Sequence, residues 1–236
     1  MLEVHKIDLG LIDYQEAWDL QESKMQEGLK VKAARFNTQE STTLTTTPIP
    51  HHLYVCQHPH VYTLGKSGVI ENLLINNQHL IDIGATFVQT NRGGDITYHG
   101  PGQMVAYPIL DLEQIFTDLG KYMRSLEEVI ILTIGAFGIE AGRLEGSTGV
   151  WLDADNPAKA RKICAMGVKC SRWMTMHGLA LNINSDLQYF NYIVPCGIVD
   201  KGVTSMAKEL GGPVDEEKVK AIFFEKFAQV FNVILR

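Results

Sequence analysis

A cysteine between a proline and a glycine is the side chain of this sequence best suited to nucleophilic chemistry. Cys196 lies in YFNYIVPCGI, where the proline ends an apolar run and the glycine can expose the next backbone N–H. Such a bend can present a thiol together with a hydrogen-bond donor for an oxyanion. A reactive thiolate also needs a cation or base nearby. Lys162 in the strand-like ARKICAMG is one candidate for this group. His99 or His177 could also lie close to Cys196 in space.

A second stretch, RGGDITYHGPGQMVAYPILDL, places special backbone residues beside polar side chains. Gly93 and Gly94 can let backbone N–H groups approach a ligand closely. Arg92 can hold a carboxylate or phosphate, or it can brace the loop. His99 can shuttle a proton, or it can cap the turn. Taken alone, the stretch is equally consistent with a binding site and with ordinary turns.

A long basic span follows in the second half of the chain. Between residues 156 and 185 there is no Asp or Glu, whereas the span contains Lys159, Arg161, Lys162, Lys169 and Arg172. This pattern is typical of a solvated charged face. It could also dock an acidic partner by electrostatic steering.

Two other motifs do not support cofactor chemistry. LGKSG (64–68) resembles a phosphate-binding loop, but the full pattern needs a glycine where this chain has His60. Four histidines, at 51, 52, 58 and 60, lack the spacing of a metal site and are expected to have surface or hydrogen-bonded roles. We therefore expect no metal and no bound cofactor. The four cysteines form no CxxC pair, which argues against a disulfide framework.

The elements that must position these residues follow from hydrophobic periodicity. Strands cluster in the middle of the chain and helices flank them, without strict βαβ alternation. This order favours an α+β fold with a mixed or antiparallel central sheet, built as a single catalytic domain over residues 1–236. Strands are expected at 2–9, 53–57, 86–90, 103–110, 149–153, 162–169 and 177–186, and helices at 14–36, 75–84, 120–139 and 216–234. The strand at 177–186 alternates in polarity as a half-buried strand does.

Composition excludes several classes of protein. The 236 residues carry a formal net charge of −6, whereas a nucleic-acid binder needs a basic excess. Hydrophobic residues make up 45% and charged residues 20%, as in ordinary globular proteins. The N-terminal sequence lacks the pattern of a signal peptide, and the longest apolar run is too short to span a bilayer. We expect a cytoplasmic protein without a membrane segment.

Several stretches together resemble one family, the lipoyl(octanoyl) transferases. They occur in the family's order and cover most of the middle of the chain, and the RGG-to-HGPGQ block together with VPCG is highly specific. The resemblance implies the fold of the biotin and lipoate protein ligases. The matching stretches are HPHVYTLGKSG (58–68), RGGDITYHGPGQMVAYPILDL (92–112), GVW (149–151), RKICAMGVK (161–169), HGLALNIN (177–184) and YFNYIVPCGI (189–198).

The resemblance implies transfer of an octanoyl group from octanoyl-acyl carrier protein to a lysine of a lipoyl domain. The acceptors would be the lipoyl domains of 2-oxoacid dehydrogenase E2 subunits and the glycine cleavage H protein. Cys196 would form an acyl thioester, and Lys162 would activate its thiol either as a base or as a charged partner. The resemblance places Arg92, Gly93, Gly94, Asp95, Ile96, Thr97, Tyr98, His99, Ala165, Met166, Gly167, Gly178, Leu179 and Ala180 around the acyl group. The family usually has alanine at the position of Cys164 in this chain.

Three other functions remain open at this point. An ATP-dependent lipoate or biotin ligase of related fold would form an acyl-adenylate and would not need Cys196. A non-catalytic binder of lipoyl domains or carrier proteins would tolerate its loss. A cysteine hydrolase would release free fatty acid instead of passing the acyl group to a lysine.

Overall fold

The computed structural model describes residues 1–38, 48–156, 158–194 and 201–236. Within these residues, nine strands form one large sheet in the order β12-β1-β2-β6-β10-β9-β8-β7, with β11 paired to β9. β1 runs parallel to β12 and β2, and β11 runs parallel to β9, whereas the other neighbours are antiparallel. The predicted mixed sheet is thus confirmed. The strands are β1 Leu2–Leu11, β2 His52–Gln57, β6 Gln103–Ile109, β7 Gly142–Leu144, β8 Ser147–Leu152, β9 Arg161–Ser171, β10 Met174–Asn182, β11 Gly202–Val203 and β12 Val233–Leu235.

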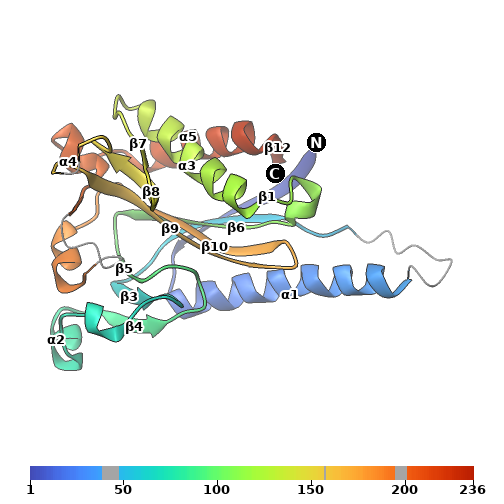
Figure 1. Ribbon diagram of the computed structural model, residues 1–236, viewed down its shortest axis with the longest axis horizontal. Helices are drawn as coiled ribbons and strands as arrows, with labels where there is room; N and C mark the ends of the chain where they lie inside the picture. The colour runs from blue at the N-terminus through green and yellow to red at the C-terminus, as the bar shows by residue number, and fades with distance from the viewer. Residues whose placement is uncertain (39–47, 157, 195–200) are drawn as a thin grey trace.

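A small sheet lies beside the large one and contains the second half of the RGGDITYH stretch. It has the order β4-β3-β5, with β3 at Val61–Leu64, β4 at Thr86–Gln89 and β5 at Ile96–His99. The short helix α2 (Asn77–Asp82) lies next to it (Figure 1). Sequence patterns predicted β4 and α2 but missed β3 and β5, which lie within the HPHVYTLGKSG and RGGDITYHGPG stretches, where glycines and polar residues interrupt the pattern of a strand.

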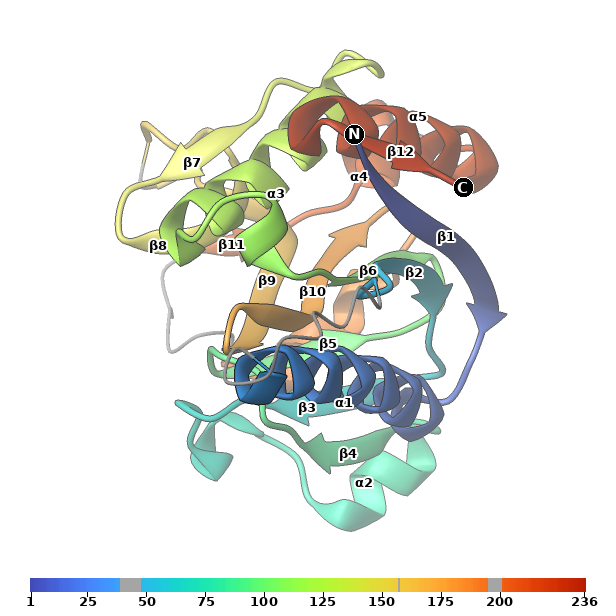
Figure 2. The ribbon, with the colours of Figure 1, turned by 90° about the vertical axis from the view of Figure 1, so that its right-hand side faces the viewer.

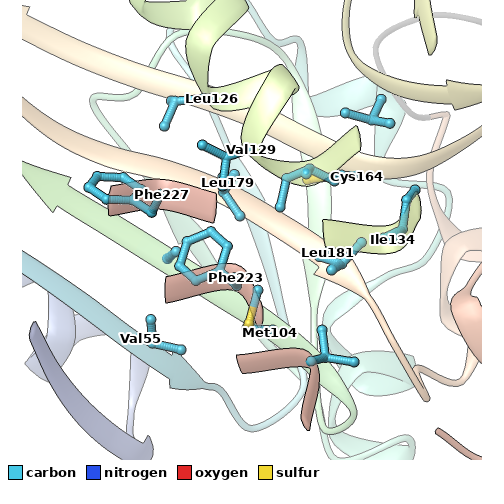
Figure 3. Close-up of a cluster of buried hydrophobic side chains, with 14 of the residues drawn as sticks. Val55, Met104, Leu126, Val129, Ile134, Cys164, Leu179, Leu181, Phe223 and Phe227 are labelled. Atoms are coloured by element: carbon cyan, nitrogen blue, oxygen red, sulfur yellow. The ribbon is translucent and has the colours of Figure 1, made fainter. Parts of the chain in front are cut away.

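Helices cover both faces of the large sheet. α1 (Tyr14–Thr38) lies on one face, and α3 (Leu119–Gly135) and α5 (Glu216–Phe231) pack together on the other (Figures 1 and 2). A further short helix, α4 (Met206–Leu210), precedes α5. Side chains of α3, α5 and the sheet point toward one another in the larger core, where Figure 3 labels Leu126, Phe223 and Phe227. None of the helices of the described residues is long and apolar enough to cross a membrane.

The strand β10 is buried along its whole length, so the expectation of a half-buried strand is wrong. Leu179 and Leu181 join the core under α3 and α5, while Met176 and Ala180 join a second core under α1. The polar residue in the pattern, Asn182, is buried as well. Its amide accepts a hydrogen bond from Gln103 Nε2 (2.9 Å) and donates one to Thr204 O (3.0 Å). A polar residue at an alternating position therefore marks a satisfied buried amide here and not a solvent face.

The C-terminal helix ends earlier than its hydrophobic pattern predicts. α5 begins at the cap Asp215, whose side chain accepts a hydrogen bond from Lys218 N (3.1 Å). It stops at Asn232, which has a left-handed φ of 52°. Residues 233–235 then pair with β1 as strand β12 and do not continue the helix. The apolar residues of this tail fit a buried strand as well as a helix face, and pairing with the N-terminal strand decides between them.

Candidate active site

A cavity of about 560 Å³ lies between the 92–95 loop, β5 and the strands β9 and β10. Its volume is in the usual range of small-molecule sites. Among the residues that the sequence placed around an acyl group, the cavity is lined by Arg92, Gly93, Gly94, Asp95, Ile96, Thr97, His99, Lys162, Ala165, Met166, Gly167, Gly178, Leu179 and Ala180. Three segments that are far apart in the chain thus meet at one cavity.

Small side chains on adjacent strands form one wall of this cavity. Ala180 of β10 is the register partner of Val105 on β6 and of Ala165 on β9, and all three line the cavity. Two residues along the ladder, Gly178 pairs with Gly167. Because these positions carry few side-chain atoms, the sheet leaves apolar space above its surface.

Arg92 braces the loop, which was one of the two roles that its position allowed. Its guanidinium is buried and donates from Nη2 to Thr63 O (2.6 Å) and Oγ1 (2.9 Å), and from Nη1 to Gly93 O (3.1 Å). The planar fork of donors suits this multiple anchoring of one loop to β3. The backbone N–H of Gly93 also donates to Val168 O (2.9 Å), which ties the loop to β9.

The glycines of the site let backbones approach one another. A Cβ at Gly167 would lie 2.6 Å from Gly93 O, and one at Gly178 would lie 2.1 Å from Ala106 O. The LGKSG stretch contributes in the same way, since a Cβ at Gly65 would lie 2.2 Å from Gly94 O. Three backbone bonds fasten this stretch to the 92–95 loop, among them Lys66 N to Arg92 O (3.0 Å). The stretch that resembles a phosphate-binding loop therefore holds the 92–95 loop in place in the cavity wall.

Replacing Gly94 by valine is expected to lower the rate of acyl transfer by about 100-fold. Gly94 has a φ of 88°, and a Cβ there would lie 3.4 Å from Arg92 Nη1 in the cavity wall. The strained backbone should also cost about 1–3 kcal/mol of unfolding free energy. Initial-rate measurements and thermal melts check both effects. Gly138→Val is the matched control, because Gly138 has a φ of 80°, open space around it and no place in the cavity. Equal activity of the two variants would contradict this role of Gly94.

Burial keeps the two histidines of the cavity neutral. It lowers the pKa of His99 to about 3, with His58 adding to the shift. The Nδ1–H of His99 donates to Gln103 Oε1 (2.7 Å), which leaves Nε2 as the acceptor nitrogen, 3.4 Å from Thr63 Oγ1. Burial likewise lowers the pKa of His177 to about 3, and its Nε2 bonds to Asn91 Oδ1 (2.7 Å). Neither imidazole therefore takes up a second proton and becomes positively charged at neutral pH.

Tyr98 lies outside the cavity wall, although the resemblance placed it there. Its ring stacks on Tyr189 at 5.0 Å, and its hydroxyl bonds to His60 Nδ1 (2.8 Å). On β5, successive side chains point to opposite faces, so Thr97 and His99 face the cavity while Tyr98 faces the other way. Tyr98 instead belongs to the core of the small sheet.

Lys162 lines the cavity from the beginning of β9, where it is the second residue of the strand. Trp151 of β8 is its register partner, and Lys162 Nζ lies 4.6 Å from the centroid of the indole ring. On the other side of β9, Val203 of β11 pairs with Lys162, and Thr204 N donates to Lys162 O (2.9 Å). Cys196 lies outside the described residues. The chain is described again from residue 201, and Val203 pairs with Lys162.

The three described cysteines are poor nucleophiles. Burial raises the pKa of Cys56, Cys164 and Cys170 above the usual range of a thiol. Cys164, the residue that departs from the family pattern, is fully buried in the core under α3 and lies outside the cavity wall. Within the part of the chain that the structure describes, no group of three His, Cys, Asp or Glu side chains could hold a metal ion.

Much of the positive charge in the 156–185 span is paired with acidic residues from elsewhere. Arg161 forms ion pairs with Glu209 (2.7 Å) and with Asp153, and Lys169 forms one with Glu22 (3.1 Å). An isolated sequence span cannot show which charges the fold brings opposite it. The span is therefore a weaker positive surface than its composition predicts.

Several cavity residues were not identified from the sequence. Tyr14 comes from the start of α1, Tyr107 from β6, and residues 146–148 from the end of the β7–β8 turn and the start of β8. Burial raises the pKa of Tyr14 to about 12, and its ring stacks on His99 at 5.7 Å. The sequence holds two weak signals for these residues. Tyr107 lies on the same face of its strand as Val105, which also lines the cavity, and residues 146–148 directly precede the GVW motif.

Comparison with known proteins now decides the family. Residues 13–228 match the model of the lipoyl protein ligase A/B catalytic domain. The octanoyltransferase of Flavobacterium johnsoniae is 55% identical over 228 residues, which cover 95% of each chain. The chain belongs to the lipoyl protein ligase A/B family. This confirms the resemblance based on the RGG, HGPGQ and VPCG motifs.

Solved structures of the lipoyl protein ligase A/B family and of related ligases share the fold. The bi-partite lipoate protein ligase of Thermoplasma acidophilum superimposes with a TM-score of 0.67 at 13% identity, covering 100% of this chain and 85% of that one. A biotin protein ligase from Aquifex aeolicus gives 0.52 at 12% identity, covering 97% and 70%. The fold implied by the motifs is thus confirmed, while identities this low carry no information about the reaction.

Proposed function

We propose that this chain is an octanoyltransferase that passes an octanoyl group from octanoyl-acyl carrier protein to a lysine of a lipoyl domain, through a thioester on Cys196. The observation that carries the proposal is the cavity wall, where an apolar row of side chains on three strands lines the same cavity as Lys162. An alkyl chain requires such a row, and acyl transfer requires a cation or base at its end.

The cavity is large enough for an octanoyl group, and its wall is mostly apolar. Burial of the eight-carbon chain contributes about 5 kcal/mol at about 0.8 kcal/mol per methylene. Several polar groups in the wall have partners within the protein, as Arg92 bonds to Thr63 and His99 bonds to Gln103. They therefore do not require a polar ligand, and an alkyl chain can lie against them without leaving them unpaired.

The reaction proceeds in two steps. The Cys196 thiolate attacks the octanoyl carbonyl carbon, the new C–S bond forms, the old C–S bond breaks and the carrier-protein thiolate leaves. The amine of the lipoyl-domain lysine then attacks the Cys196 thioester, the C–N bond forms and the C–S bond to Cys196 breaks. Lys162 stabilises the thiolate or takes the proton from the attacking amine. The first step exchanges one thioester for another and the second yields an amide, so neither needs ATP.

The acceptors in this proposal are the lipoyl domains of 2-oxoacid dehydrogenase E2 subunits and the glycine cleavage H protein. The relatives named octanoyltransferase support the reaction class. The family model that matches residues 13–228 is that of lipoyl protein ligases, which supports a lipoyl domain as the acceptor.

The test is octanoylation of an apo lipoyl domain, followed by its intact mass, with octanoyl-acyl carrier protein and no ATP. We expect the domain to gain one octanoyl group under these conditions and to gain none with octanoate and ATP. Gain only with octanoate and ATP would show an adenylating ligase. Release of free octanoate without modification of the domain would show a hydrolase, and absence of both would show a binding module.

A further inference from the structure

Trp151 lies beneath the cavity lysine and nothing in the reaction so far uses it. Its side chain is only 2% exposed, and its ring centroid lies 4.6 Å from Lys162 Nζ. An ammonium group over an indole face is attracted by the negative face of the ring, and tryptophan gives the strongest such contact. The indole Nε1–H also donates to the backbone oxygen of Ser147 (3.3 Å), the first residue of β8, which lines the cavity.

Gly149, two positions before Trp151, leaves space for the aliphatic part of the Lys162 side chain. Gly149 has a φ of 121°, and a Cβ there would lie 2.6 Å from Cys164 O and 3.5 Å from Cδ and Cε of Lys162. Gly149 and Trp151 face the same side of β8. The lysine stem therefore passes over the glycine, and its ammonium reaches the indole.

A buried carboxylate fixes the start of this strand. Glu127 of α3 is fully buried, and its Oε1 accepts a hydrogen bond from Gly149 N (3.0 Å). Its Oε2 pairs with Arg124 (2.7 Å) and Arg143 (3.1 Å). The backbone beneath the Lys162 stem is thus tied to the helix layer and does not depend on the cavity contents.

We propose that Trp151 is a positioning residue that holds the Lys162 ammonium at the end of the acyl cavity through a cation–π contact, with Gly149 leaving the path for the lysine stem. The inference rests on the proposed function, because it assigns a purpose to the lysine of that reaction. A lysine side chain has four rotatable bonds, and fixing its end before substrate arrives removes an entropic cost from the reaction.

The test compares three changes at position 151 in single-turnover octanoyl transfer from octanoyl-acyl carrier protein. Trp151→Leu removes the ring, and Trp151→Phe keeps a smaller one. A ring-fluorinated tryptophan placed at 151 by stop-codon suppression weakens the negative ring face while keeping the shape and the fold. We expect about a 2- to 30-fold lower rate constant for Trp151→Leu, a smaller loss for Trp151→Phe, and a loss with fluorination, all at unchanged KM.

Two controls separate this role from simple packing. Phe116→Leu removes another cation–π contact of 4.6 Å, with Lys121, and neither residue lines the cavity, so this variant should keep the wild-type rate constant. In a Lys162→Met background, Trp151→Leu should cause no further loss, because the tryptophan acts through the lysine.

The outcomes are distinct. Wild-type rate constants in both Trp151→Leu and the fluorinated protein would overturn the inference and leave the proposed function standing. An equal loss in the Lys162→Met background would also overturn it, because the tryptophan would then act by packing alone. A wild-type protein that never transfers octanoate would overturn the proposed function and this inference together.

Discussion

Replacing Cys196 by alanine is expected to abolish octanoyl transfer, with a loss of about a thousand-fold or more. The reaction needs a thiolate that can carry the acyl group between donor and acceptor. The described cysteines cannot substitute for it, since burial raises the pKa of Cys56 and Cys164 and neither lines the cavity. Single-turnover transfer to an apo lipoyl domain, followed by mass, measures the loss.

The matched control for this substitution is Cys170→Ala. Cys170 lies near the end of β9, is partly exposed and does not line the cavity. The control should retain the wild-type rate. A Cys196→Ala variant that still transfers at more than about a tenth of the wild-type rate would contradict a cysteine thioester and favour a direct transfer between the two protein substrates.

Replacing Lys162 by methionine is expected to lower the transfer rate by about 100-fold or more, the usual contribution of a positioned acid–base group. Methionine keeps an unbranched apolar stem over Gly149 and removes the ammonium, so the fold should survive. Rate constants for formation and for breakdown of the acyl-enzyme, followed separately by quenched-flow mass analysis, measure the effect on each step.

Lys162→Arg distinguishes the two roles that the lysine can have. Arginine stays charged but cannot act as a base at neutral pH. If Lys162 stabilises the thiolate by its charge, the arginine variant keeps part of the acylation rate, whereas a base role predicts loss of the second step. Lys159→Met is the control, because Lys159 is exposed, lies three residues away and does not line the cavity. Full activity in Lys162→Met would contradict both roles.

The sequence predicts the cavity well because its motifs fall on three segments that the fold must bring together. The 92–99, 165–167 and 178–180 residues line one space, with Tyr98 as the exception. Tyr98 lies within a motif in which nearly every residue resembles the family. Only the alternation of a four-residue strand, pairing Tyr98 with Tyr62, shows that its ring points into the small-sheet core. A motif identifies a segment, and strand geometry decides which of its side chains reach the ligand.

Contacts between distant segments were beyond sequence reasoning. LGKSG suggested a phosphate loop, yet its glycines serve the close packing against Gly94 and Asp95. Arg161 looked like a free positive charge until the fold placed Glu209 opposite it. The contact of Lys162 with Trp151 depends on the register of β8 against β9, which has an irregularity at this very point. Such contacts are set by tertiary structure, and the local propensities of the residues cannot predict them.

The most direct test of the account is the intact mass of the wild-type protein after mixing with octanoyl-acyl carrier protein in the absence of ATP. The account predicts a gain of one octanoyl group that hydroxylamine removes, with peptide mapping placing it on Cys196. Addition of an apo lipoyl domain should then discharge it to a lysine of that domain. An unchanged mass, or an octanoyl group found on any other residue, would contradict the central claim that Cys196 carries the acyl group.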